Sequence, residues 1–165
     1  MKTIITTLAL ALTMIVCNAQ NKLNNSKKLE KMKTELELTN KEKASALITS
    51  LETGDKSTIA YINPTNYKQH NLSVADGLEG FGAVLHHAPK GGFKANVVRS
   101  FQDGEYAFTH TEYDFFGPKI GFDIFKFENG KIVEHWDNFS DLAPANPSNR
   151  SQTDGVIKIK NYDKT

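Results

Sequence analysis

A change in the spacing of apolar residues at Gly92 constrains the fold of this chain most strongly. Before Gly92 the apolar residues recur at helical intervals, and after it they alternate as they do in half-buried strands. The alternating part is divided by Asp103-Gly104 and Asn129-Gly130, dipeptides that favour tight hairpins. Helices followed by an antiparallel meander are the element order of an α+β fold, so the alternation that builds a parallel sheet is excluded.

The sequence predicts three helices and then four strands. The first helix begins at the capping pair Thr39 and Glu42 and ends at Gly54. A short second helix follows Asp55, and a third follows Asp76. The predicted helices span residues 39–54, 57–62 and 77–87, and the predicted strands span residues 93–102, 106–115, 119–128 and 131–139. The sheet must bend around the helices.

The first 19 residues have the features of a secretory signal peptide. Lys2 precedes an apolar run from Ile4 to Val16, and Asn18-Ala19-Gln20 supplies a small residue and a polar exit. The run is shorter than the roughly 20 residues that cross a bilayer. We expect cleavage after Ala19 and export to the periplasm or the extracellular space. The alternative is a lipoprotein modified at Cys17, although a branched valine precedes that cysteine.

The charge balance excludes several kinds of partner. The chain has 20 basic and 19 acidic side chains, and removal of residues 1–19 takes away one lysine and leaves 19 of each. We therefore expect no nucleic-acid partner and no membrane contact beyond export. The single cysteine, Cys17, lies in the predicted signal peptide, so we expect no disulfide and no thiol nucleophile in the mature chain.

The mature chain is predicted to have three parts. Residues 20–38 are rich in Lys, Asn and Glu and suit a flexible or loosely helical leader. Residues 39–142 hold the predicted helices and strands and form one domain. Residues 143–165 form a C-terminal tail, in which Val156, Ile157 and Ile159 could add a short edge strand or dock on the domain.

The hairpin at Asn129-Gly130 predicts which side chains meet. A two-residue turn there pairs Glu128 with Lys131 and places Asp123 directly opposite Trp136. Side chains two apart share a face, so Phe125 and Glu134 join them there, and the other face carries Phe122, Ile124, Val133 and His135. His110 shares the face of Asp123 only if the loop around Gly117 and Pro118 has an even number of residues.

An aspartate among aromatic residues suggests acid–base chemistry. Burial disfavours the charged form, so the pKa of Asp123 should rise and the residue could donate a proton near neutral pH. His110 could exchange that proton. The alternative is that Asp123 is a hydrogen-bonded core residue without a chemical role, because buried polar groups usually have partners.

Other kinds of site find little support in the sequence. No pair of the five histidines has the spacing that presents two imidazoles to one metal, and neither a GxSxG elbow, a P-loop nor a dinucleotide fingerprint is present. We therefore expect no metal and no cofactor. The polar segment Gln69-His70-Asn71 is either a simple turn or a part of the site that faces a ligand.

Four stretches together carry a resemblance to a known family. They are residues 67–71 (Tyr-Lys-Gln-His-Asn), Asp76-Gly77, residues 122–127 (Phe-Asp-Ile-Phe-Lys-Phe) and residues 130–137 (Gly-Lys-Ile-Val-Glu-His-Trp-Asp). The chain resembles the SnoaL-like branch of the nuclear transport factor 2-like superfamily. The resemblance implies an α+β fold, a cone-shaped barrel in which three N-terminal helices pack on a curved antiparallel sheet around a pocket.

The resemblance also implies a chemistry. The family includes polyketide cyclases, which perform intramolecular aldol reactions, and it is similar to ketosteroid isomerase. The resemblance places Asp123 at the position of the acid–base aspartate of the cyclases. The proton-abstracting carboxylate of the isomerase corresponds to His70, and its oxyanion tyrosine corresponds to Leu47. Steroid isomerase activity itself is therefore not expected.

These observations lead to one main interpretation and two alternatives. The main one is an exported enzyme that moves a proton next to a carbonyl, with His70 or His110 as the base and Asp123 as the acid or oxyanion donor. The residues expected to bind a small apolar or carbonyl-containing substrate are Tyr67, Asn71, Phe125, Glu134 and Trp136. The alternatives are a non-catalytic binding module for a lipophilic small molecule and a dimerisation scaffold that pairs through the outer face of the sheet as a homodimer.

Overall fold

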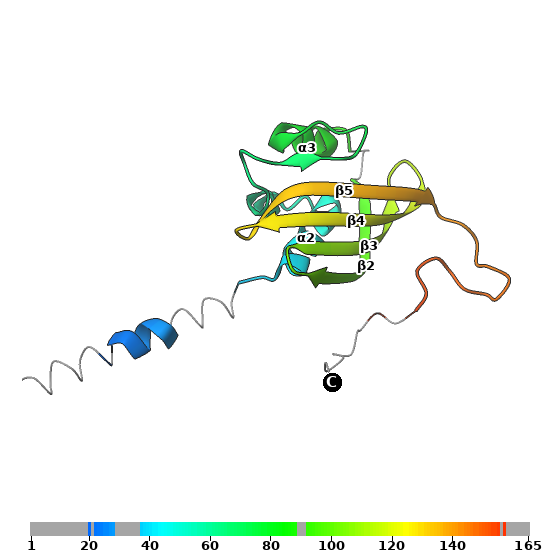
Figure 1. Cartoon of the computed structure of the whole chain (residues 1–165). Helices are drawn as coiled ribbons and strands as arrows, with labels where there is room; N and C mark the ends of the chain where they lie inside the picture. Colours follow the sequence, from blue (N-terminus) through cyan, green and yellow to red (C-terminus); the bar gives the residue numbers. More distant parts are fainter. Residues whose placement is uncertain (1–19, 21, 29–36, 89–91, 156, 158–165) are drawn as a thin grey trace, which may run out of the picture. The chain divides into compact units, whose positions relative to one another are not determined.

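The computed structural model describes residues 20, 22–28, 37–88, 92–155 and 157 (Figure 1). The chain divides into two compact units, Met1–Leu38 and Thr39–Thr165. In the first unit residues 20 and 22–28 are helical, and the predicted signal peptide lies outside the described residues. Within the described part of the chain, no helix has both the length and the apolar character needed to cross a membrane.

The second unit confirms the α+β fold with its helices before the long strands. Its helical elements are α2 (Asn40–Thr53), the 3-10 helix η1 (Lys56–Tyr61) and α3 (Gly77–His86). Its strands are β1 (Lys68–Gln69), β2 (Lys94–Asp103), β3 (Tyr106–Asp114), β4 (Pro118–Glu128) and β5 (Lys131–Asp141). They form one curved sheet in the order β1-β5-β4-β3-β2, in which β1 is parallel to β5 and the other pairs are antiparallel.

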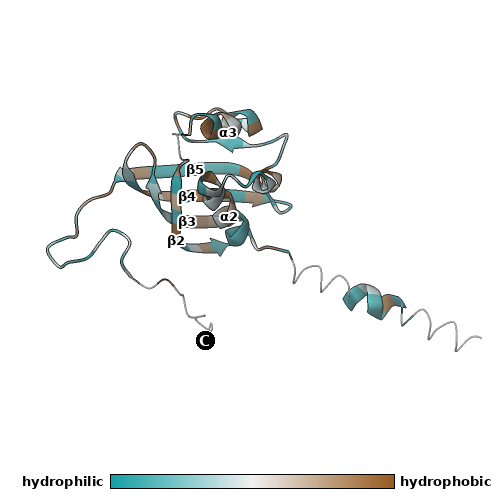
Figure 2. Ribbon diagram, turned by 180° about the vertical axis from the view of Figure 1, so that it is seen from behind, coloured by the Kyte–Doolittle hydropathy of each residue, from teal (hydrophilic) through white to brown (hydrophobic). Residues whose placement is uncertain are grey.

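Helix α2 forms where the capping pattern predicts it and covers one face of the sheet. The Glu42 carboxylate accepts hydrogen bonds from the Thr39 N–H and hydroxyl, both at 2.7 Å, and Gly54 ends the helix with a φ of 72°. α2 packs across β2 and β3 (Figures 1 and 2). We call the face that α2 covers the inner face and the opposite one the outer face.

The hydrophobic core lies between α2 and the inner face. Leu47 and Ile48 of α2 are buried and belong to one cluster with Phe125, Phe127 and Ile132 of β4 and β5. Full burial of a Leu, Ile or Phe side chain contributes about 1.5–3 kcal/mol. This layer therefore fixes α2 on the sheet and forms one wall of the space that α3 closes.

The register of the β4–β5 hairpin corrects the sequence prediction. The turn at Asn129-Gly130 forms, and Phe127 pairs with Ile132 as expected. A β-bulge then follows: Lys126 pairs with Glu134, so Val133 is an extra residue on β5. After the bulge, every side chain of β5 therefore points to the face opposite to the one that the sequence predicted.

The bulge changes which residues face Asp123. Asp123 lies opposite Asp137, and Trp136 lies opposite Ile124. The prediction that Asp123 faces Trp136 is therefore wrong. His135 and Asp137 point to the inner face, and Glu134 and Trp136 point to the outer face.

The β3–β4 connection resolves the open question about His110. Asp114 pairs with Pro118, so the loop holds three residues, an odd number. His110 pairs with Phe122, and Asp123 pairs with Thr109. Because paired residues share a face, His110 and Asp123 lie on opposite faces of the sheet.

Strand β1 is a short element that the sequence did not predict. Lys68 and Gln69 pair with Glu134 and His135 at the edge of the sheet, and α3 lies next to this edge (Figure 1). Asp76 was expected to cap α3, but its Oδ1 instead accepts the Gln69 N–H at 2.7 Å. The start of α3 is thereby tied to β1.

The segment after β5 is irregular and passes over the outer face. The Arg99 guanidinium donates to the carbonyl oxygens of Thr153 and Asp154 at 2.5 and 3.3 Å, and the Thr153 hydroxyl donates to Glu112 at 2.6 Å. The predicted edge strand or docked tail around Ile157 falls largely outside the described residues.

Candidate active site

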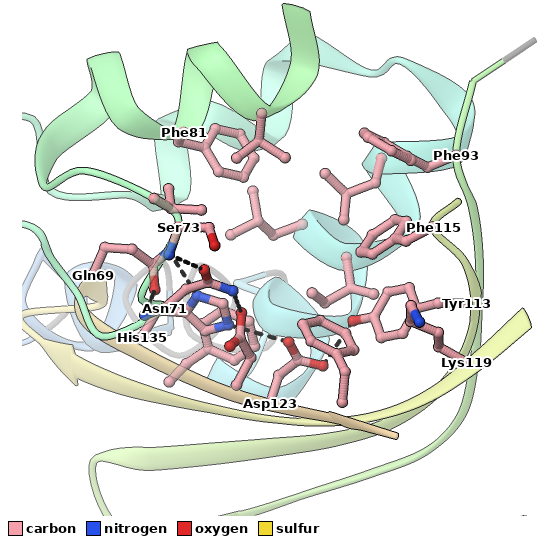
Figure 3. Close-up of a pocket in the computed structure, with 18 of the residues that line it drawn as sticks. Gln69, Asn71, Ser73, Phe81, Phe93, Tyr113, Phe115, Lys119, Asp123 and His135 are labelled. Carbon is pink, nitrogen blue, oxygen red and sulfur yellow. Dashed lines mark hydrogen bonds and ion pairs between the residues drawn. The ribbon is translucent and has the colours of Figure 1, made fainter. Parts of the chain in front are cut away.

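A cavity of about 320 Å³ lies between the inner face of the sheet, α2 and α3 (Figure 3). Its wall is mainly apolar and aromatic and includes Leu47, Ile48, Leu51, Phe81, Val84, Phe93, Phe115, Phe125 and Phe139. Its polar side chains include Tyr67, Gln69, Asn71, Asp123, His135 and Asp137. An apolar cavity of this size with a few convergent polar groups is typical of a small-molecule site.

Asp123 is a buried acceptor at the floor of this cavity. Its Oδ2 accepts hydrogen bonds from the Tyr113 hydroxyl at 2.7 Å and the Thr109 hydroxyl at 3.1 Å, and its Oδ1 lies 3.2 Å from His135 Nε2. Only 1% of Asp123 is exposed. This arrangement leaves one acceptor position, on Oδ1, for any further donor.

The hydrogen bonds around His135 fix its tautomer. Gln69 Oε1 accepts the Asn71 N–H at 3.0 Å, so the Gln69 amide nitrogen is the atom that lies 3.0 Å from His135 Nδ1. Nδ1 therefore accepts a hydrogen bond, and the ring proton sits on Nε2, where it is donated to Asp123. The imidazole also stacks on Phe125 with ring centroids 4.5 Å apart, which fixes its plane.

Asp137 is the carboxyl that borders the cavity most openly. It is half-buried, and its Oδ2 accepts a hydrogen bond from the Asn71 side-chain amide at 2.7 Å. Burial raises the pKa of Asp137, and the charge of Asp123 raises it further, whereas the Asn71 hydrogen bond and His135 act in the opposite direction. A carboxyl with a raised pKa in an apolar cavity is suited to exchange protons.

Two tyrosines supply hydroxyl groups to the same region. Burial raises the pKa of both Tyr67 and Tyr113, with a further contribution from nearby aspartates, so both hydroxyls stay protonated. The Tyr113 hydroxyl donates to Asp123. The Tyr67 oxygen accepts from Gln69 at 3.2 Å, and no hydrogen bond among the described residues uses the Tyr67 proton. That proton is available to an acceptor in the cavity.

Asp123, His135 and Asp137 also have the composition of a metal-binding cluster. One ligand atom of each lies within 4.8 Å of the others. Both imidazole nitrogens, however, already take part in hydrogen bonds, to Gln69 and Asp123. A metal ion would have to displace one of them, so the donor set does not fit a resident cation as it stands. The sequence prediction of no metal stays a prediction.

Four of the residues predicted for the site line the cavity. They are Asp123, Tyr67, Asn71 and Phe125. Gln69 also lines the cavity and belongs to segment 69–71, for which the sequence left a turn and a ligand-facing role open. His135 and Asp137 line the cavity as well, and the sequence did not single them out for it. Because neighbours in a strand alternate, only one pair of residues 134–137 could face a cavity. The sequence prediction chose Glu134 and Trp136, whereas the bulge at Val133 turns His135 and Asp137 inward.

The remaining predicted residues lie on the outer face. The His70 ring stacks on Trp136 with centroids 4.5 Å apart, and His70 Nε2 lies 3.1 Å from Glu134 Oε2. This hydrogen bond lowers the pKa of Glu134. His70, Glu134 and Trp136 thus form one cluster on the outer side of the β1 edge, and none of the three lines the cavity of the inner face.

His110 is also separated from Asp123 by the sheet. It is buried on the outer face, stacked on Phe122 with centroids 4.2 Å apart, and its Nδ1 lies 3.2 Å from Arg99 Nη1. Burial and then the charge of Arg99 lower its pKa. The predicted pairing of His110 with Asp123 is therefore wrong, because the three-residue loop sets the alternative register.

Comparisons with solved structures identify the fold. A nuclear transport factor 2-like protein of unknown function from Cytophaga hutchinsonii is 16% identical, with 63% of this chain and 92% of that chain covered and a TM-score of 0.55. A similar protein from Burkholderia xenovorans is 22% identical, with coverage of 66% and 88% and a TM-score of 0.52. The chain has the nuclear transport factor 2-like fold. No family model and no curated protein matches the sequence.

One of the similar solved structures is an enzyme of known class. An LEH-like epoxide hydrolase from M. tuberculosis is 17% identical to this chain, with 61% of this chain and 82% of that chain covered and a TM-score of 0.51. In the present chain the cavity of this fold holds a half-buried carboxyl, Asp137, a hydroxyl donor, Tyr67, and a buried Asp123–His135 pair. Such a set can polarise an oxygen atom and move a proton near it.

Proposed function

We propose that this chain is a SnoaL-like small-molecule enzyme that performs acid–base chemistry next to a carbonyl without a cofactor. The observation that carries the proposal is Asp137, a half-buried carboxyl with a raised pKa in a mainly apolar cavity. The base is thus assigned to Asp137, and neither His70 nor His110 takes part.

The chemical step begins with the loss of a proton beside the carbonyl. The Asp137 carboxylate takes this proton, and the C–H electron pair moves into an enolate whose oxygen accepts a hydrogen bond from the Tyr67 hydroxyl. The charge of Asp137 contributes to the raised pKa of Tyr67, as expected for electrostatic neighbours. In an isomerisation Asp137 then returns the proton to another carbon. In an aldol cyclisation the enolate carbon attacks a second carbonyl carbon, and Asp137 gives its proton to the alkoxide that forms there.

Asp123 has a positioning role in this proposal. Three protein donors occupy its oxygens, so it holds the Tyr113 hydroxyl and His135 in place. His135 in turn orders Gln69, which lies against Tyr67. The resemblance pointed to Asp123 as the acid itself, whereas these contacts favour Asp137 as the proton carrier.

The test is deuterium incorporation into cyclic ketones and enones in D₂O, followed by NMR. We expect Asp137→Asn to slow enzyme-dependent exchange by about 10² to 10⁴, the usual contribution of a positioned base. Asp103→Asn, at the exposed end of β2, is the matched control and should exchange as the wild type does. Tight binding without exchange, unchanged in Asp137→Asn, would instead favour the binding module.

We also propose that the protein is exported and processed after Ala19. The support is the short apolar run behind Lys2 and the polar exit at Gln20. Intact mass spectrometry of the exported protein should give a chain that begins at Gln20. A chain that begins at a lipid-modified Cys17 would show the lipoprotein alternative to be correct.

For the assembly we propose a homodimer through the outer face of the sheet. Phe101 and Phe122 are 46% and 55% exposed there, and Phe108 stacks on Phe101 with centroids 4.6 Å apart. Exposed aromatic side chains grouped on one sheet face are a common feature of interfaces. A second copy of the chain is the partner that would cover them.

A further inference from the structure

Lys119 of β4 is a cationic side chain in the wall of the cavity. Among the described residues that line the cavity, Lys119 is the one Lys or Arg. It pairs with Tyr113 across β3 and β4 and shares the inner face with Asp123, which lies four residues further along the strand. A cation in the wall of a mainly apolar cavity is a candidate contact for an anionic ligand group.

Lys119 and the acid–base groups lie in different parts of the cavity. In Figure 3 Gln69, Asn71 and His135 occupy one side, and Lys119 lies beyond Tyr113 on the other. Four residues of strand separate the Cα atoms of Lys119 and Asp123 by about 13 Å. The wall between them is aromatic and includes Tyr113 and Phe139.

Lys119 forms an ion pair with Asp141 that is largely exposed to solvent. Lys119 Nζ lies 2.7 Å from Asp141 Oδ1, but 88% of the Asp141 side chain is exposed, against 31% of Lys119. An exposed ion pair of this kind contributes little to stability, because water solvates both charges. A ligand carboxylate that reaches Lys119 from inside the cavity would form a less solvated pair and could replace Asp141.

We propose that the substrate is an elongated apolar keto acid, with its carbonyl at Asp137 and its carboxylate on Lys119. The proposal rests on the proposed function and names the substrate class of the same cavity. Lys119 acts on specificity, because it holds the end of the molecule that does not react. The aromatic wall between the two ends accepts the apolar chain.

The test compares 9-oxodecanoate with its methyl ester by isothermal titration calorimetry. The two probes share the ketone and the chain and differ in the charge at the far end. We expect wild-type protein to bind the acid at least about tenfold more tightly than the ester. Lys119→Met should remove that preference and leave the affinity for the ester unchanged, and Lys119→Arg should keep it.

Asp141 provides the matched variant. Asp141→Asn removes the competing carboxylate and should raise the affinity for the acid by about two- to fivefold, with no change for the ester. Equal binding of acid and ester by wild type, the same acid preference in Lys119→Met, or no binding of either probe would each overturn the proposal. The unfolding temperature of each variant verifies that it folds.

Deuterium exchange next to the ketone separates this proposal from the proposed function. If the acid is preferred through Lys119 but never exchanges, the anchoring role stands and the acid–base proposal fails. If both probes exchange in an Asp137-dependent way and bind equally well, the acid–base proposal stands and the anchoring role fails.

Discussion

At the scale of single residues, the charged form of the Asp137 carboxyl should lower the stability of the folded protein by a measurable amount. Its pKa is raised mainly by burial, so the folded state binds its proton more tightly than the unfolded chain does. The stability of the folded protein associated with this proton is complete at pH values below the unfolded pKa of about 3.9 and is lost as the pH rises through the folded pKa.

Asp137→Asn should therefore stabilise the protein at pH 7.5 and not near pH 4. The asparagine can still accept the Asn71 hydrogen bond, and the half-buried charge at position 137 is removed. Thermal unfolding at the two pH values measures the difference, and the exposed Asp103→Asn variant should stay within about 0.5 kcal/mol of wild type. Destabilisation of Asp137→Asn at pH 7.5 would contradict the argument.

Gln69 is predicted to set the protonation of His135. In the wild type we expect ¹⁵N NMR to show the proton on Nε2, because the Gln69 amide donates to Nδ1. Gln69→Glu keeps the size of the side chain and turns this donor into an acceptor, so Nδ1 should carry a proton in the variant. A ring with its proton on Nε2 alone in the variant would show that Gln69 does not control the tautomer.

The sequence predicted part of the site and could not predict the rest. Asp123, Tyr67, Asn71 and Phe125 follow from the strand pattern and the resemblance, and all line the cavity. His135 and Asp137 could not be chosen over Glu134 and Trp136, because the choice depends on a single extra residue in β5. The alternation of side chains along the strand allowed either pair to face the cavity.

At the scale of elements, the contact between α3 and the segment before it sets one wall of the cavity. A Cβ added at Gly80 would lie 1.8 Å from the Ala75 carbonyl oxygen, whereas one added at Gly82 would meet nothing within 4 Å. Both glycines are in α3, and the neighbouring Phe81 lines the cavity. The two positions therefore form a matched pair within one helix.

Gly80→Ala and Gly82→Ala should change stability in opposite directions. Gly82→Ala should stabilise by about 0.5–1 kcal/mol, because alanine loses less backbone entropy in a helix. Gly80→Ala must move α3 away from Ala75 and should destabilise by about 1–3 kcal/mol, with weaker ligand binding. Urea unfolding measures both, and equal stabilisation by the two substitutions would exclude the close contact.

Element order was predictable because its signals are local. The capping pair at Thr39, the stop at Gly54 and the turn at Asn129-Gly130 each act within a few residues, and the structure places elements there. The bulge at Val133 and strand β1 depend on distant contacts, since Gln69 pairs with His135 across 66 residues of sequence. No local residue type marks such features.

At the scale of the whole molecule, the two faces of the sheet have different roles. The inner face holds the cavity, whereas the outer face holds the exposed rings of Phe101 and Phe122 and the segment that Arg99 binds near Thr153. An exposed aromatic surface in a protein with balanced charge favours association. This asymmetry is the physical basis for expecting a dimer, and it leaves the cavity open to ligands.

Phe122→Glu should convert the dimer to a monomer. A carboxylate at this position would be desolvated in the interface and would face its own copy across a two-fold axis. Sedimentation velocity at about 100 µM should show wild type as a dimer and the variant as a monomer, because association depends on concentration. Leu72→Glu is the control, since Leu72 is fully exposed on the segment between β1 and α3 and should leave the dimer intact. A monomeric wild type, or equal dissociation by both substitutions, would mean that the outer face does not pair.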